Sequence, residues 1–434
     1  MILDPITLVF GSLVVFLLFG VPVAYALGMS SLLVIVWADL PLSIFAQRAY
    51  QSLDSFVMLA VPFFLLVGLL MNSAGISARM LELAGAMFGR TRGALAKVNV
   101  AVSMLFAGLS GSSVADVAGM GSVLIPAMIR EGYPRAFAVA VTAASSTIGI
   151  IIPPSIFMVV YGAVGDVSIG ALFLAGALPG LLIGVTQITF CHLLAIRQNH
   201  PVGQPFSLAR LGRAAQRGVL PFGVTVVIIG GIIGGIFTAT EAAAVAVIYT
   251  LLLGIFYRTL KLRGLIDSFH GAAVHLGPTL LCVATGSVFA WVLAFLQVPN
   301  EVSRMVAYLD PSPSMVLMFI MVLFVIVGTF ESGVASIIIF LPIVQPIAAA
   351  AGLDPVHVGV IVCMTLALGL ITPPYGLCLF VAARIGGISV ERSFVAVLPW
   401  IGLFLVVDVI CVLLPDLVLF LPRLLVPQFM GMPQ

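Results

Sequence analysis

Long apolar runs follow one another along almost the whole chain, and they limit what it can fold into. An α-helix needs about 20 consecutive apolar residues to cross the hydrocarbon core of a bilayer. The 434 residues are 62% hydrophobic and 8% charged, whereas soluble domains contain about 25% charged residues. The sequence therefore predicts an all-α polytopic membrane protein. Its roughly ten to twelve crossing segments lie at about 6–37, 55–73, 98–128, 136–165, 169–196, 218–236, 240–257, 271–297, 314–349, 355–383 and 393–421.

The basic residues indicate how the segment 98–128 enters the membrane. Most of the 18 Lys and Arg residues fall into five clusters, which we place on the cytoplasmic side by the positive-inside rule. Two clusters flank this segment, so a single crossing would put one of them on the wrong side. A Gly/Ser-rich stretch at 108–113 interrupts the segment, and such stretches break helices. We therefore expect a re-entrant hairpin that turns at mid-membrane, where irregular backbone is tolerated when it is buried in protein.

The segment 314–349 has a similar length and a similar interruption, at residues 328–333. Its flanks carry Asp310 and Asp354 rather than basic residues. We therefore expect a second hairpin that enters from the opposite side. The two segments are candidates for an inverted pair.

The two halves of the chain match at an offset of 220 residues. The matched pairs are Gly108 with Gly328, Ser112 with Ser332, Pro126 with Pro346, Gly149 with Gly369, and Pro153-Pro154 with Pro373-Pro374. Weak internal symmetry with interrupted helices at corresponding positions indicates the site of a secondary transporter. The sequence therefore predicts an inverted repeat with two re-entrant hairpins and two Pro-Pro broken helices.

This repeat divides the chain into four parts. We expect N-terminal scaffold spans and a cytoplasmic amphipathic linker at 1–97, and central scaffold spans at 201–313. The first transport repeat is expected at 98–200 and the second at 314–421, with broken helices at 136–165 and 355–383. The run 6–37 is either one long helix or two short ones separated at residues 20–22. It lacks a basic n-region, so we expect a retained span rather than a signal peptide.

The double prolines release backbone carbonyl groups. Proline has no N–H, so Pro153 and Pro154 leave the carbonyls of Gly149 and Ile150 without their helical donors. Pro373 and Pro374 do the same to Gly369 and Leu370. Free carbonyls with nearby hydroxyl groups suit a hard cation such as sodium. The alternative interpretation is a plain kink in a packed helix.

Four acidic residues lie within or beside apolar runs, where carboxylates are functional by default. Asp116 follows Ser113 at the spacing of a capping box, so it is either a cap or a cation ligand. We call the expected turns of the two hairpins, at 108–113 and 328–333, the first and second tips. Glu331 lies at the second tip, and we expect a functional role for it. Glu241 is a cap, a contact or a site residue, and Asp408 is expected to be structural. The histidines near span ends, which are His192, His270, His275 and His357, are expected to be interfacial.

Four motifs occur in the order found in a known family. They are GVPVAYALG at 20–28, GLSGSS at 108–113, GIIIPPS at 149–155 and TPPYG at 372–376. With them the chain resembles, over essentially its whole length, the large membrane subunit of the tripartite ATP-independent periplasmic (TRAP) transporters. The resemblance implies an elevator-type, sodium-coupled importer of organic anions in the bacterial inner membrane. It also implies two partners, a four-helix small membrane subunit and a periplasmic substrate-binding protein.

The resemblance implies that the tips and the broken helices carry the sodium and substrate sites. The predicted cation ligands are Ser110, Ser112, Ser113, Gly149, Ile150, Gly328, Gly369 and Thr372. The predicted substrate contacts are Gly111, Ser145, Ser146, Thr147, Pro153, Pro154, Glu331, Ser332, Gly333, Pro373 and Pro374. We expect no organic cofactor, no catalytic residue, no metal other than sodium and no nucleic-acid partner. The small subunit is expected to be a separate chain, because no span precedes the run 6–37.

Other functions remain open at this point. A self-sufficient sodium–carboxylate symporter would use the same hairpins without a binding protein. Residues 108–111 also match a Gly-x-Ser-Gly nucleophile site, which raises an intramembrane serine hydrolase as an alternative. Such a hydrolase needs a base within hydrogen-bond reach, and no histidine lies deep inside an apolar run. A channel is a third alternative. The anion is open among C4-dicarboxylates, sugar acids, sialic acids and 2-oxo acids.

Overall fold

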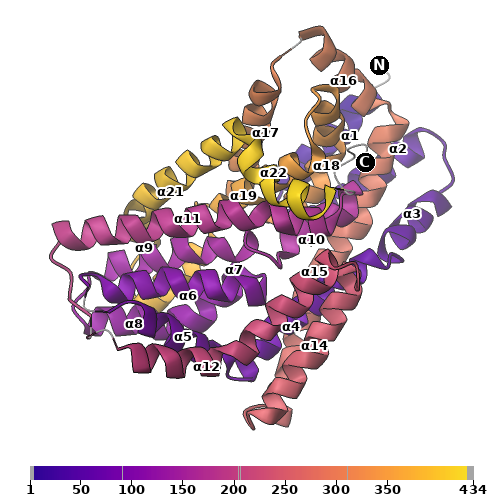
Figure 1. Cartoon of the computed structure of the whole chain (residues 1–434). Coiled ribbons are helices and arrows are strands. Elements are labelled where there is room, and N and C mark those ends of the chain that lie inside the picture. Colours follow the sequence, from indigo (N-terminus) through magenta and orange to yellow (C-terminus); the bar gives the residue numbers. More distant parts are fainter. Residues whose placement is uncertain (1–3, 90, 204, 206, 310, 428–434) are drawn as a thin grey trace.

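The computed structural model describes residues 4–89, 91–203, 205, 207–309 and 311–427, which form an all-helical protein (Figure 1). In this part of the chain, eight helices are long and apolar enough to cross a membrane. The number becomes nine when the bent pair Ser43–Leu53 and Val57–Ser73 counts as one span. The prediction of an all-α polytopic protein is confirmed. Fewer long spans occur than the ten to twelve expected, because several apolar runs are divided into shorter helices.

The N-terminal part consists of short helices separated by glycine and proline. The run 6–37 is two helices, because Gly20 adopts a left-handed conformation with φ +76° and Pro22 precedes the second helix. These helices, α1 and α2, pack against each other. The elements of this part are α1 (Pro5–Leu18), α2 (Val23–Trp37), α3 (Ser43–Leu53), α4 (Ala60–Ser73) and α5 (Ile76–Met87).

A helix–turn–helix unit and an interrupted helix follow. The first unit starts four residues before the predicted hairpin and ends two residues after it. Its arms are α6 (Ala94–Ser110) and a second arm made of α7 (Ser113–Asp116), a π-helical turn (Val117–Gly121) and α8 (Ser122–Arg130). The interrupted helix consists of α9 (Arg135–Ser146), a 3-10 turn (Thr147–Ile150) and α10 (Ile156–Gly165), and the long α11 (Ile169–Arg197) comes next.

The same order of elements recurs in the C-terminal part. A helix–turn–helix unit precedes an interrupted helix, and a long apolar helix comes after them. The elements are α17 (Pro313–Phe330), α18 (Gly333–Ala350), α19 (Pro355–Gly369), α20 (Leu377–Gly386), α21 (Val390–Leu413) and the terminal α22 (Pro415–Leu425).

The central helices contact the N-terminal ones. They are α12 (Leu208–Thr225), a π-helical turn (Val226–Gly230), α13 (Gly231–Ile233), α14 (Ala239–Phe256), α15 (Leu262–Phe295) and α16 (Val298–Leu309). The helix α12 packs on α5, α14 packs on α4, and α15 packs on α2, α3 and α4. Figure 1 shows α14 and α15 along one flank and α6, α8 and α9 grouped on the other. We refer to α2, α4, α14 and α15 as the scaffold helices.

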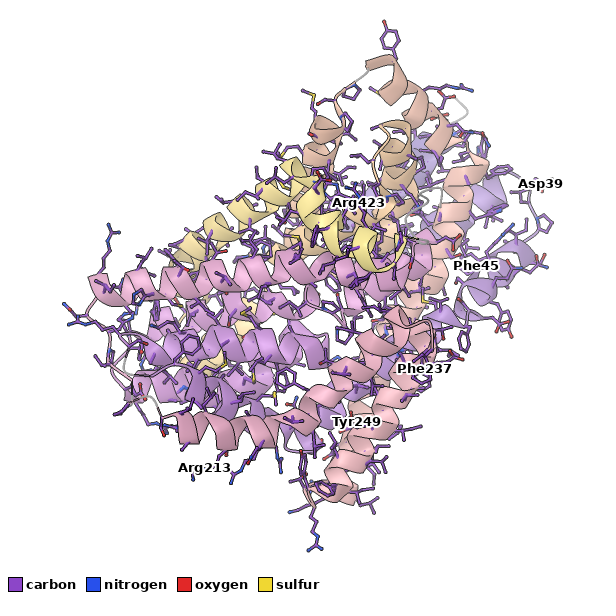
Figure 2. The ribbon with its side chains drawn as sticks, in the orientation of Figure 1. Asp39, Phe45, Arg213, Phe237, Tyr249 and Arg423 are labelled. Carbon is purple, nitrogen blue, oxygen red and sulfur yellow. The ribbon has the colours of Figure 1, made fainter. Side chains whose placement is uncertain are left out.

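Polar contacts fasten the central helices at their ends. Arg217 of α12 pairs with Glu82 of α5 at 3.1 Å, and the Tyr249 hydroxyl donates to the Leu220 carbonyl at 2.9 Å. Figure 2 shows Arg213 on the outer side of α12. At the start of α14, the Thr238 hydroxyl accepts from the Glu241 N–H, while the Glu241 carboxylate accepts from the Thr238 N–H. Of the alternatives considered for Glu241, the helix cap is therefore the one that the structure shows.

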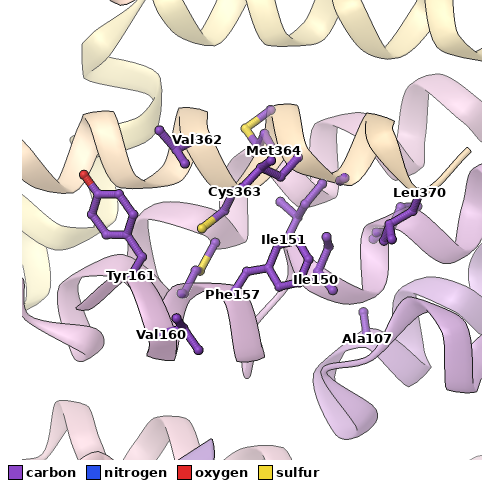
Figure 3. Close-up of a cluster of buried hydrophobic side chains, with 14 of the residues drawn as sticks. Ala107, Ile150, Ile151, Phe157, Val160, Tyr161, Val362, Cys363, Met364 and Leu370 are labelled. Atoms are coloured by element: carbon purple, nitrogen blue, oxygen red, sulfur yellow. The ribbon is translucent and has the colours of Figure 1, made fainter. Parts of the chain in front are cut away.

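The core between the two interrupted helices is apolar. Figure 3 shows side chains of α10, among them Phe157 and Tyr161, packed against Cys363 and Met364 of α19. The helices α10 and α19 are also in direct contact along the chain's interior. These apolar side chains pack densely against one another. Their close packing holds the two halves of the molecule together.

Candidate functional site

The first tip is a sharp turn that needs a glycine. The helix α6 ends at Ser110, Gly111 adopts φ +60°, and Ser112 is extended before α7 begins. A left-handed φ favours glycine. A Cβ at Gly111 would also lie 2.8 Å from the Pro154 carbonyl oxygen. The turn therefore packs directly on the Pro-Pro break of its own half. The side chain of Ser110 lies outside the described residues.

Oxygen atoms gather where this tip meets the first break. A Cβ built on Gly149 would lie 2.6 Å from Asp116 Oδ2 and 3.5 Å from the Ser113 backbone nitrogen. Ser113 and Asp116 are 1% and 2% exposed. Among the described residues, no hydrogen-bond partner reaches the buried Ser113 hydroxyl. A buried hydroxyl without a partner is costly unless something binds it, so this cluster has the character of a ligand site.

The capping interpretation of Asp116 is wrong. The residue before α7 is Ser112, so Ser113 is already the first residue of the helix. A capping box joins the N-cap to the third helical residue, and that residue is Ala115 rather than Asp116. The carboxylate instead lies against Gly149 of the interrupted helix. Sequence spacing alone does not reveal this contact, because it depends on how the tip packs.

The second tip packs on the second break in a similar way. A Cβ on Gly369 would overlap the carbonyl group of Gly328, so the two backbones touch. The Tyr375 N–H donates to the Thr329 carbonyl at 2.8 Å. A Cβ built on Gly333 would overlap the ring of Phe157, which belongs to the first half. The second tip thus contacts both interrupted helices.

Glu331 and Ser332 shape the start of α18. The Ser332 hydroxyl accepts from the Ala335 N–H at 3.2 Å and acts as the N-cap. The Glu331 carboxylate accepts from the Ser332 N–H at 2.9 Å. The tip is therefore ordered by its own side chains. Glu331 and Ser332 also line a cavity beside this tip.

The prediction that the prolines leave free carbonyls is wrong for three of the four groups. The Ile150 carbonyl accepts from the Ser155 hydroxyl at 2.6 Å. The Gly369 carbonyl accepts from the Thr372 N–H at 3.3 Å, and the Leu370 carbonyl accepts from the Cys378 N–H at 2.9 Å. Where the helix is interrupted, donors from residues further along the chain form hydrogen bonds with these carbonyl oxygens. Each carbonyl oxygen still has a second lone pair that can face an ion.

The predicted hydroxyl groups lie in the helix wall behind the tips. Ser146 and Thr147 donate to the carbonyls of Ala143 and Ala144, and Thr372 donates to Leu368. Ser145 accepts from Ser103 in a buried polar contact between α9 and α6. Such bonds leave the hydroxyl oxygens available as acceptors. Ser145, Ser146 and Thr147 are at most 1% exposed.

Two cavities open between the tips and the scaffold helices. A cavity of about 630 Å³ is lined by Glu331 and Ser332 of the second tip and by Tyr25 of α2. A second cavity of about 760 Å³ is lined by Ser112 of the first tip and by Val334 of α18. Thr279 of α15 lines both. The two tips therefore face adjoining spaces along the same helix.

Sequence reasoning missed two cavity residues. Asn72 of α4 and His275 of α15 line the larger cavity, whereas His275 was expected at a membrane interface. His357, also expected at an interface, is buried instead, with its Nε2 atom 2.9 Å from the Cys411 carbonyl oxygen. Asp408 is fully buried in α21. The only sequence signal at His275 is the Gly-Pro pair that follows it, which indicates an irregular helix.

Two tips packed against two interrupted helices in an all-helical membrane protein indicate a secondary transporter. The chain matches the family described as "Tripartite ATP-independent periplasmic transporter, DctM component" over residues 10–417, and it belongs to this family. It is a multi-pass protein of the bacterial inner membrane. This is a family of transporters and not of enzymes, which excludes the serine hydrolase alternative.

Two relatives and one solved structure illustrate the match. The chain is 38% identical to the C4-dicarboxylate TRAP transporter large permease protein DctM of Pseudomonas aeruginosa, over 92% of this chain and 94% of that protein. It is 37% identical to the isethionate TRAP transporter permease protein DctMQ of Oleidesulfovibrio alaskensis, over 96% of this chain and 66% of that protein. The YdaH transporter of Alcanivorax borkumensis is similar in fold, with a TM-score of 0.60 at 16% identity over 86% of this chain and 87% of that one.

Proposed function

We propose that this chain imports a small organic anion across the inner membrane and that sodium drives the uptake. The observation that carries the proposal is the first tip, where the Ser113 hydroxyl and the Asp116 carboxylate are buried against Gly149. Buried carboxylates in proteins are commonly hydrogen-bonded, paired with a positive charge or bound to a cation. Hydroxyl, carboxylate and carbonyl oxygens are ligands that suit a hard cation. The second break supplies a hydroxyl oxygen at Thr372 and a carbonyl oxygen at Gly369.

The relatives support an organic anion as the substrate. The names of two of them specify a C4-dicarboxylate and isethionate, and sugar acids and sialic acids belong to the same chemical class. We propose that the chain works with a periplasmic substrate-binding protein and a small membrane subunit. The DctMQ relative is longer than this chain, which fits a permease with the small subunit fused to it.

Sodium titration tests the proposed coupling. In the reconstituted complex, Ser113→Ala and Thr372→Ala are expected to raise the half-saturating sodium concentration about tenfold each, which corresponds to about 1.4 kcal/mol. The matched control is Ser31→Ala, since Ser31 is a buried hydroxyl of α2 that donates to the Leu27 carbonyl. Uptake is measured across a range of sodium concentrations at constant ionic strength. Unchanged sodium dependence in both variants would show that neither the first tip nor the second break is a cation site.

We also propose that the two helix–turn–helix units are re-entrant hairpins of an inverted repeat that moves as an elevator. The recurring order of elements and the packing of each tip on its own break support this. A cysteine at position 112 is then expected to react with an impermeant thiol reagent from the cytoplasmic side. A cysteine at 332 is expected to react from the periplasmic side.

Labelling in right-side-out and inside-out vesicles measures this sidedness. The five native cysteines are buried, so the background is expected to be low. Reaction of both positions from the same side only, in every sodium and substrate condition, would contradict the inverted repeat.

A further inference from the structure

The cavity of about 760 Å³ has two chemically different walls. Ser112 and Ala115 of the first tip and Val334 of α18 form one wall. Asn72 of α4 and His275 of α15 lie on the opposite wall, which the scaffold helices form and which we call the scaffold wall. The remaining lining is largely apolar, with aliphatic residues from α4, α7, α10 and α20. A ligand in this space would meet polar groups at two ends and apolar surface between them, as is usual for small-molecule sites.

His275 is the one titratable side chain among the described residues that line this cavity. A histidine ring carries at least one N–H donor, and the Asn72 amide carries two. Hydrogen bonds from such donors to an ionised group are stronger than neutral ones. Neither carboxylate of the tips lines this cavity, since Asp116 is buried and Glu331 lines the neighbouring cavity. The scaffold wall therefore offers donors without a competing negative charge.

The sequence around His275 keeps this wall open. Pro278 lies inside α15, and the Thr279 hydroxyl donates to the His275 carbonyl at 3.2 Å. A Cβ built on Gly277 meets no atom within 4 Å, and Gly277 lines the neighbouring cavity, so α15 borders open space on two faces at this turn. An ionisable residue within an apolar span normally faces a cavity or a partner. Here the His275 side chain is exposed and lines the cavity.

We propose that His275 and Asn72 form an anion subsite on the scaffold wall, which receives the carboxylate or sulfonate group of the transported anion. The proposal rests on the proposed function, because it assumes that the tips hold the cation. The cation is then held by buried groups of the first tip, whereas the anion lies on the scaffold wall of the cavity that the same tip lines. The scaffold helices, and not only the tips, thereby contribute to substrate selection.

Equilibrium binding to the purified membrane complex tests the subsite without the binding protein. The probes are radiolabelled succinate, gluconate, N-acetylneuraminate and isethionate at saturating sodium. The variants are His275→Ala, His275→Gln and Asn72→Ala. The control is His270→Ala, since His270 is exposed on the same helix and is not among the lining residues. Monodisperse elution of each variant confirms that it folds.

We expect His275→Ala and Asn72→Ala to raise the Kd of the probe that binds the wild type by about tenfold or more, as for loss of a hydrogen bond to a charged group. His275→Gln retains an N–H donor and is expected to lose less. The sodium half-saturation is expected to stay within about twofold, because the cation ligands are intact. Unchanged Kd values with normal sodium dependence would overturn the subsite alone. Sodium-independent binding, or no binding of any probe to the wild type, would overturn the proposed function and the subsite with it.

Discussion

Replacing Gly369 by alanine is expected to abolish sodium-dependent uptake by the reconstituted complex. A Cβ at this position would overlap the carbonyl group of Gly328. The obstacle is backbone and not a flexible side chain, so the second tip must separate from its break. Overpacking costs up to about 3 kcal/mol, which corresponds to about 100-fold in an equilibrium constant. The loss is measured as uptake per amount of inserted protein.

Gly402→Ala is the matched control for this substitution. Gly402 lies in α21, and a Cβ there meets no atom within 4 Å. We expect its uptake to equal that of the wild type, with both variants inserted and monodisperse. Wild-type uptake by Gly369→Ala would mean that contact between the second tip and its break is not required for transport.

Liposomes that contain this chain alone are expected to show no uptake of free substrate under a sodium gradient. The family works as a multicomponent system, and we propose that the small subunit completes the frame against which the tips move. Exposed apolar side chains on α1, such as Leu18 and Phe19 at 82% and 83%, offer surface for lipid or for that subunit. Addition of the small subunit and the loaded binding protein is expected to restore uptake.

The measurement compares the single chain with the full complex at equal protein density. Rapid uptake of succinate, gluconate, N-acetylneuraminate or isethionate by the single chain would favour the self-sufficient symporter. That result would not bear on the sodium sites proposed at the tips. The two questions are therefore separable.

The positions where helices end could be predicted from sequence because their causes are local. Glycine at a left-handed φ ends α6 at Gly111, and proline without an N–H interrupts the helices near Pro153 and Pro373. The apolar runs likewise predicted α11 and α14 within one residue of their bounds. Membrane insertion requires each helix to satisfy its own backbone bonds, so residue type alone marks these elements well.

Contacts between distant segments were decided by packing and could not be read in the same way. Asp116 lies against Gly149 instead of capping α7, and the Ile150 and Gly369 carbonyls accept bonds from Ser155 and Thr372. The position of His275 beside the first tip depends on how α15 crosses α4. Glycines set how closely two backbones approach, but which backbones meet is a property of the whole fold. For that physical reason the helix breaks were predictable, whereas the atoms that meet where the tips pack on the breaks were not.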